Sequence, residues 1–196
     1  GEGATLNNIG LVYRNLGRYE QALDYFEQAL AIRTEAGDRA GVGQTLNNIG
    51  AVYDSRGRYE QSLTYFEQAL AIATEASDRA GEGTTLNNIG LVYRNLGRYE
   101  QSLTYYEQAL AIRTEVGDRV GEGTTLYNIG AVYRNLGRYE QALAAYEQAL
   151  AIRTEVGDRA GEGDTLNNIG LVYRNLGRYE QSLPYFEQAL AIATEA

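Results

Sequence analysis

The stretch Leu6-Asn7-Asn8-Ile9-Gly10 decides the fold of this chain, because it returns at a fixed step of 40 residues. The same residues stand at 46–50, 86–90 and 166–170, and the copy at 126–130 differs only by Tyr127 in place of the first asparagine. Repeats of this length are typical of stacked units that cannot bury their apolar faces alone. The sequence therefore predicts a single array over residues 1–196, with repeats at 1–40, 41–80, 81–120, 121–160 and 161–196.

Apolar spacing predicts two helices in each repeat. In the first copy Leu6, Ile9 and Tyr13 lie on one stripe of a helix with 3.6 residues per turn, and Leu23 and Phe26 belong to a second stripe of the same kind. We refer to these two helices of a repeat as the first and the second helix. Two helices joined by a short turn pack as antiparallel neighbours, so the expected fold is an all-α array of five helix hairpins.

Glycine and aspartate mark where the helices begin and end. Gly17 and Gly37 can end a helix in the left-handed conformation, and Asp38 can cap the next helix, which we expect to begin near Arg39. The recurring glycine at Gly41 indicates either close packing against the preceding helix or a looser first turn. Two local exceptions stand out. Ser77 replaces a helix-ending glycine and predicts a strained or altered turn, and Pro184 lies inside a predicted helix, where we expect a mild kink.

With the spacing established, the chain resembles the tetratricopeptide repeat family. The resemblance rests on the order of small, large and aromatic residues, which in the first copy are Leu6, Ile9, Gly10, Tyr13, Gly17, Tyr19, Ala22, Phe26 and Ala29. Leu6 stands where the family often has tryptophan, and Thr34 stands near its usual proline. The longer 40-residue unit is similar to the repeats of kinesin light chains, spindle-orientation adaptors and large bacterial signalling proteins. The resemblance implies a right-handed superhelical solenoid whose first helices line a concave groove that binds extended peptides.

Composition excludes several classes of function. The net charge is −9, which disfavours nucleic acid and anionic membranes as partners, and no apolar run is long enough to span a membrane. Histidine and cysteine are absent, and the carboxylates recur identically in every repeat, whereas catalysis needs one asymmetric constellation. We therefore expect a soluble protein, with the cytoplasm as its first expected location, that is not an enzyme and binds no cofactor or metal.

Many of the differences between the copies fall on the face of the first helix opposite the apolar stripe, where asparagines form two rows, one at Asn7 and its counterparts and one at Asn8 and its counterparts. An asparagine amide can pair with both the C=O and the N–H of an extended peptide, so these rows are candidate peptide-binding residues. The alternative is that they bond to a neighbouring helix and orient the stack. The candidates are Asn7, Asn8, Asn47, Asn48, Asn87, Asn88, Asn128, Asn167 and Asn168.

Beside the amides, an arginine recurs at Arg14, Arg94, Arg134 and Arg174, while repeat 2 has Asp54. A guanidinium pairs with carboxylates through a planar fork, so these residues predict an acidic peptide ligand. The alternative is a solvated arginine or one paired with Glu20 or its equivalents. Tyr127 is either an anchor for an apolar ligand group or a position that has drifted.

A second hypothesis assigns the chain a structural role. Nearly identical repeats are also expected of a spacer or self-associating rod with no specific peptide ligand, designed or recently duplicated. The sequence opens at Gly1 and closes on a predicted second helix with no polar capping helix, so we expect excision from a longer protein and end-to-end self-association.

Overall fold

The computed structural model describes residues 1–195, which form ten α-helices and no strand. They fall into two compact units, Gly1–Leu96 and Gly97–Ala196, here called the N-terminal and the C-terminal unit. The N-terminal unit holds α1 (Glu2–Asn15), α2 (Tyr19–Glu35), α3 (Arg39–Ser55), α4 (Tyr59–Glu75) and α5 (Arg79–Asn95). The C-terminal unit holds α6 (Tyr99–Val116), α7 (Arg119–Asn135), α8 (Tyr139–Val156), α9 (Arg159–Asn175) and α10 (Tyr179–Glu195). The predicted all-α array of hairpins is confirmed.

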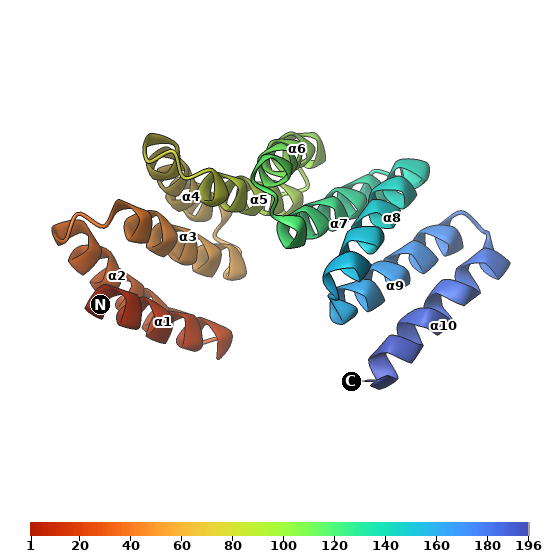
Figure 1. Ribbon diagram of the computed structural model, residues 1–196, viewed down its shortest axis with the longest axis horizontal. Coiled ribbons are helices and arrows are strands. Elements are labelled where there is room, and N and C mark those ends of the chain that lie inside the picture. The colour runs from red at the N-terminus through yellow and green to blue at the C-terminus, as the bar shows by residue number, and fades with distance from the viewer. Residues whose placement is uncertain (196) are drawn as a thin grey trace. The chain divides into compact units, whose positions relative to one another are not determined.

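Within each unit, consecutive helices pack against each other (Figure 1). The hairpins close where a phenyl or phenol ring lies on a glycine. A Cβ added at Gly50 would lie 2.8 Å from the ring of Phe66, and one at Gly130 would lie 2.8 Å from the ring of Tyr146. No larger residue fits at these glycines without moving the ring, which fixes how closely the two helices of a hairpin approach.

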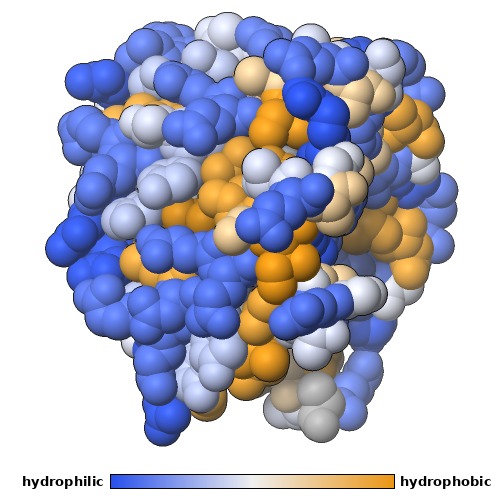
Figure 2. All heavy atoms as spheres, turned by 90° about the vertical axis from the view of Figure 1, so that its left-hand side faces the viewer, coloured by the Kyte–Doolittle hydropathy of each residue, from blue (hydrophilic) through white to orange (hydrophobic). Residues whose placement is uncertain are grey.

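Apolar side chains of successive hairpins form the core between the helices. In the N-terminal unit Ile49 and Val52 of α3 pack on Ala22, Leu23 and Phe26 of α2. Each hairpin therefore buries its apolar stripe against the next, as expected for a repeat array. The face in Figure 2 is mostly hydrophilic, with apolar side chains showing in bands between the polar ones. Among residues 1–195, no helix is both long and apolar enough to cross a membrane.

The turns follow the predicted chemistry. Gly17 and Gly37 adopt φ values of 70° and 68°, and the side chain of Asp38 accepts a hydrogen bond from the backbone N–H of Gly41 at 2.9 Å. A Cβ at Gly41 would lie 2.0 Å from the Asp38 carboxylate and 2.8 Å from Cδ of Arg33 on α2, so the recurring glycine reflects close packing against the preceding helix and not a looser turn. Helix α3 begins at Arg39, as predicted.

The two exceptional residues fit into regular elements. Ser77 adopts φ 56° in the same turn that glycine makes elsewhere, so the predicted strained residue is confirmed. Helix α10 continues through Pro184 without interruption, and the kink stays a prediction.

Candidate functional site

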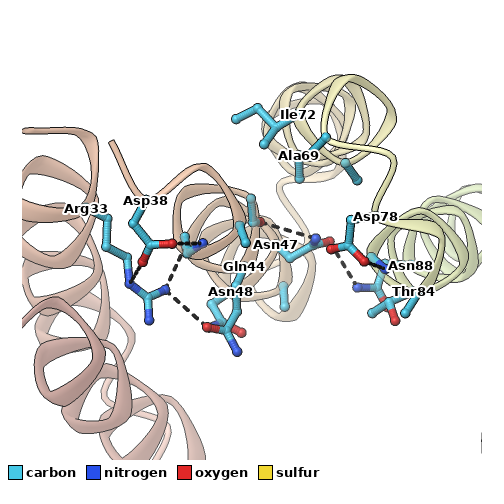
Figure 3. A pocket seen from close by; sticks show the side chains of 18 of the residues that line it. Arg33, Asp38, Gln44, Asn47, Asn48, Ala69, Ile72, Asp78, Thr84 and Asn88 are labelled. Atoms are coloured by element: carbon cyan, nitrogen blue, oxygen red, sulfur yellow. Dashed lines mark hydrogen bonds and ion pairs between the residues drawn. The ribbon is translucent and has the colours of Figure 1, made fainter. Parts of the chain in front are cut away.

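The candidate site is a groove in the N-terminal unit between α3, α4 and α5. It has a volume of about 760 Å³, and it is lined by polar side chains of α1, α2, α3, α5 and the two capped turns and by apolar side chains of α4, among them Ala69 and Ile72 (Figure 3). Its polar lining residues are Arg14, Arg33, Asp38, Gln44, Asn47, Asn48, Asp78, Thr84 and Asn88. The groove therefore presents amide, hydroxyl and charged groups beside an apolar floor.

Side-chain hydrogen bonds of the asparagine rows connect the first helices of successive repeats. Asn48 donates through Nδ2 to Oδ1 of Asn7 at 2.9 Å, and Asn88 donates to Oδ1 of Asn47 at 3.4 Å. Asn47 in turn donates through Nδ2 to the hydroxyl of Thr85 at 2.7 Å. These three amides thus bond to neighbouring first helices, and peptide binding by the same residues stays a prediction.

The two rows differ in exposure. Asn7 is 1% exposed and Asn87 is 8% exposed, whereas Asn48 and Asn88 are half-buried and line the groove together with half-buried Asn47. Asn8 is exposed on α1, which has no preceding first helix in the N-terminal unit. In this unit the row of Asn8, Asn48 and Asn88 is therefore more accessible than the row that contains Asn7 and Asn87. Binding by Asn7 or Asn87 stays a prediction.

In the C-terminal unit Tyr127 replaces an asparagine in these hydrogen bonds between first helices. Its hydroxyl accepts a hydrogen bond from Nδ2 of Asn168 at 2.9 Å, and Asn168 is buried. The guanidinium of Arg153 lies 4.6 Å from the centre of the Tyr127 ring, and the ring of Tyr146 tilts against it at 5.6 Å. Tyr127 thus packs between helices, and its role as a ligand anchor stays a prediction. Of the other candidates, Asn128 is half-buried and Asn167 is exposed.

The predicted arginine row has four different surroundings. Arg14 lines the groove, Arg174 is exposed, and Arg134 donates to Oδ1 of Asn168. Arg94 lies close enough to Asp54 to act on its charge. Glu20, the suggested partner of this row, pairs instead with Arg56 at 2.7 Å.

Asp54 reverses the charge at the edge of repeat 2. Burial raises the pKa of its carboxyl, while the hydrogen bond from Asn95 Nδ2 at 3.0 Å and the positive charge of Arg94 lower it in part. Repeat 2 therefore presents a carboxylate where the other repeats present a guanidinium.

Sequence reasoning missed a set of buried arginines on the second helices. Arg33 is 7% exposed and donates through Nη1 to the carbonyl of Gly41 at 2.7 Å and to the hydroxyl of Thr45 at 2.8 Å. Arg113 and Arg153 make the same bonds in the C-terminal unit. A signal was available, since each of these arginines is followed five residues later by the capping aspartate and twelve residues later by the threonine.

Two other arginines each pair with one exposed and one buried glutamate, the buried ones being Glu122 and Glu162. Arg119 pairs with Glu155 at 2.5 Å and also with Glu122, and Arg159 pairs with Glu195 at 2.6 Å and also with Glu162. Within residues 1–195, no group of three or more histidine, cysteine, aspartate or glutamate side chains is placed to hold a metal ion.

Stacked helix hairpins, closed by a ring on a glycine and joined by capped turns, define the class of helical repeat proteins. Within that class the chain belongs to the tetratricopeptide repeat family, whose model matches residues 2–75, 81–155 and 122–195. No curated protein matches the sequence.

Solved structures share this fold at low sequence identity. BtubC (BKLC) from P. vanneervenii is 22% identical with a TM-score of 0.87, over 98% of this chain and 81% of that one. A putative kinesin light chain from Podosopora anserina with nearly identical TPR-like repeats is 16% identical with a TM-score of 0.76, over 98% and 95%. A Rap protein complexed with competence and sporulation factor is 19% identical with a TM-score of 0.86, over 99% of this chain and 54% of that one.

Proposed function

We propose that this chain is a non-enzymatic protein-interaction scaffold that holds an extended peptide in the groove between α3, α4 and α5. The observation that carries the proposal is the amide lining of that groove. Asn48 and Asn88 each donate to the preceding first helix through Nδ2, and their Oδ1 atoms accept no hydrogen bond within residues 1–195. These two oxygens can accept main-chain N–H groups whatever side chains the peptide carries.

Arg14 supports acidic residues in the ligand. It lines the groove, and it forms no ion pair within the described part of the chain. Its planar fork can bind a carboxylate through two parallel hydrogen bonds, a geometry that an ammonium group cannot match. We propose that the peptide places an acidic side chain beside Arg14. Arg174, which is exposed in the C-terminal unit, can bind a second acidic group in the same way.

Proteins that share this fold support an interaction role. The tetratricopeptide repeat family typically serves as a protein-binding scaffold, and the Rap structure is a complex with competence and sporulation factor. The absence of histidine and cysteine from the sequence also removes the commonest general base and the strongest nucleophile. These points favour binding over catalysis.

A peptide library panned against the chain tests the proposal. We expect enrichment of acidic sequences, and we expect the double variant Asn48→Ala, Asn88→Ala to weaken binding of the enriched peptides at least tenfold. Asn15→Ala is the matched control, because Asn15 is an exposed amide on α1 outside the groove. Circular dichroism checks that all variants stay folded. Failure to enrich any peptide would refute this function.

A second candidate function, end-to-end association of copies, is favoured by an apolar hollow on the last hairpin. The hollow has a volume of about 760 Å³ and lies between α9 and α10. Its apolar lining includes Phe186, Ala189 and Ile192, and Leu190 at its edge is 64% exposed. The equivalent Phe66 and Ala69 of α4 are buried in the N-terminal unit.

The packing of α5 on α4 provides a template for this association. Helix α10 differs from α4 only by Pro184 in place of Thr64, and residues 1–15 differ from residues 81–95 only by Ala4 in place of Thr84. The α1 helix of a second copy can therefore cover α10 as α5 covers α4. Such head-to-tail contacts build open filaments when the rotation from one copy to the next does not close a ring.

Sedimentation velocity over a range of concentrations tests this second candidate. We expect the mean mass to rise with concentration, and Leu190→Glu to keep the chain monomeric. Ala191→Glu is the matched control, since Ala191 is exposed on the same helix outside the hollow, and its counterparts stay exposed where a further helix follows, at Ala31, Ala71, Ala111 and Ala151. A strict monomer at every concentration, or equal effects of the two variants, would count against end-to-end association.

A further inference from the structure

At each junction between hairpins, a turn connects a second helix to the first helix of the next repeat. Four such junctions lie within the two units, at α2–α3, α4–α5, α6–α7 and α8–α9. Three of them hold a buried arginine at the same position, and the α4–α5 junction holds Ala73 instead. The chain therefore contains three examples of a bound guanidinium and one junction that lacks it.

The three arginines bind the same set of acceptors. Their Nη1 atoms lie 2.6–2.7 Å from the carbonyl oxygens of Gly41, Gly121 and Gly161. The same nitrogens lie 2.8–2.9 Å from a threonine hydroxyl. Each Nε lies 3.7–3.8 Å from the carboxylate of the capping aspartate. A carbonyl, a hydroxyl and a carboxylate thus form a site for a guanidinium in this fold.

The α4–α5 junction keeps the carboxylate and the carbonyl but has no arginine, and the hydroxyl of its threonine, Thr85, accepts instead from Nδ2 of Asn47 at 2.7 Å. Asp78 accepts from the backbone N–H of Gly81 at 2.9 Å, and within residues 1–195 its carboxylate pairs with no arginine. The carbonyl of Gly81 accepts the hydroxyl of Thr85 at 2.8 Å, as in the other junctions, and no guanidinium reaches it. Thr84 takes the place of Gln44, whose side chain also accepts from Arg33 at 3.1 Å.

Loss of the arginine leaves the junction open. A Cβ at Gly41 would lie 2.8 Å from Cδ of Arg33, whereas the nearest atom of residue 73 to a Cβ at Gly81 is the Cβ of Ala73 at 3.4 Å. Gly81 is half-buried, while Gly41 and its two other counterparts are buried. Ala73, Asp78, Gly81 and Thr84 all line the groove (Figure 3), so the space is reached from the side where a peptide would lie.

We propose that this notch, formed by Ala73, Asp78, Gly81 and Thr84, binds the guanidinium group of an arginine in the peptide ligand. The proposal rests on the groove being a peptide site and adds a basic anchor to it. An acidic side chain beside Arg14 and an arginine in the notch give a ligand of mixed charge. Arginine is preferred over lysine because its planar fork can reach the carboxylate and the carbonyl at the same time.

A titration with a small probe tests the notch without any peptide library. The probe is Nα-acetyl-arginine methylamide, followed by the NMR amide shifts of Asp78, Gly81 and Thr85 in the full chain. We expect saturable shifts at these residues. The citrulline analogue, which has the same shape and no charge, should bind at least tenfold more weakly. Shifts that do not saturate, or equal binding of the two probes, would overturn the proposal.

Three variants sharpen the test. Ala73→Arg should fill the notch from within and remove the probe shifts, and Asp78→Asn should weaken binding at least tenfold while keeping the helix cap. Arg113→Ala should create a second notch, with new shifts at Asp118 and Gly121. Unchanged probe binding in Ala73→Arg would overturn the proposal even if Arg113→Ala failed to fold.

The outcomes separate this proposal from the peptide-binding function. If the library enriches peptides without arginine and Ala73→Arg binds them as well as the unaltered chain does, the notch is refuted and the peptide groove stands. If the probe saturates the notch and no peptide enriches, guanidinium binding by the notch stands, while the peptide groove is refuted and with it a peptide as the source of the arginine.

Discussion

Repeat 1 and repeat 2 have the same backbone turns but close them with different side chains. In repeat 1 the N–H of Gly37 bonds to the carbonyl of Thr34 at 3.1 Å, and in repeat 2 the N–H of Ser77 bonds to the carbonyl of Thr74 at the same distance. The next N–H, that of the capping aspartate, bonds back to residue 33 or 73 at 2.9 and 2.8 Å. The backbone therefore tolerates the loss of both the glycine and the arginine.

The two repeats differ in whether a side chain fills the junction and in the charge at the groove edge. Arg33 fills the α2–α3 junction, whereas Ala73 leaves the α4–α5 junction open to the groove. At the groove edge Arg14 of repeat 1 corresponds to Asp54 of repeat 2. In a repeat protein, unlike binding positions thus arise by exchanging side chains on an unchanged backbone. The following predictions test this difference.

The largest effect is expected for Arg33→Ala. The variant removes charge-assisted hydrogen bonds to Gly41 and Thr45 in a buried position, and should lower the free energy of unfolding by about 2–3 kcal/mol. Urea unfolding measures the change. Arg39→Ala is the control, because its pair with Glu75 is exposed and should contribute no more than about 1 kcal/mol. Equal losses in the two variants would mean that burial of Arg33 is not stabilising.

The capping aspartates should differ between the repeats. Asp78→Ala removes a helix cap and should cost about 1 kcal/mol, while Asp38→Ala also removes the charge that faces Arg33 and should cost about 1–2 kcal/mol. Urea unfolding of each variant gives the comparison. The difference should vanish in an Arg33→Ala background, and its persistence there would show that Arg33 is not its cause.

Ser77→Gly should stabilise the chain by about 1 kcal/mol, because serine at φ 56° carries a steric cost that glycine does not. The converse change, Gly37→Ser, should destabilise repeat 1 by a similar amount. Thermal and urea unfolding check both signs. A neutral result for both variants would contradict the assignment of strain to this turn.

The smallest effect is expected for Asp54→Asn. Because burial raises the pKa of Asp54 above its ordinary 3.8, the folded state binds this proton more tightly than the unfolded state does. The contribution of Asp54 to the free energy of unfolding therefore falls as the pH rises from 3.8 through the pKa of the folded state. The variant should be more stable at pH 7 by less than about 0.5 kcal/mol and should show no such gain at pH 3.

Urea unfolding at pH 7 and pH 3 measures this effect. Asp24→Asn, at an exposed position on α2, controls for the loss of one negative charge. A gain for Asp54→Asn at pH 3 as large as that at pH 7 would rule out titration of Asp54 as the cause.

The predictable part of the fold came from local rules. The 40-residue period, the glycine turn at Gly17 and the cap at Asp38 were all readable, because each depends on residues within one or two helical turns. The strain at Ser77 followed from the same rules. How the hairpins of one unit lie against those of the other stays a prediction from the family resemblance.

The site was predicted less completely. A helical projection places Asn7 and Asn8 on the same outer face, yet Asn7 is buried and Asn8 is exposed, because the neighbouring first helix covers one edge of that face. The buried Arg33 was overlooked because its acceptors lie eight and twelve residues away across a turn. A charged residue near a helix end looks solvated until the next helix is in place.

The sequence by itself determined the repeat, the two helices of each hairpin and the chemistry of their ends, since periodicity and capping act between residues close in the chain. Only the tertiary structure decided which amides bond to one another, because the partners Asn7 and Asn48 are 41 residues apart. It also decided that Ala73 opens a notch where Arg33 closes one. That difference depends on the distance between packed helices, which no single helix specifies.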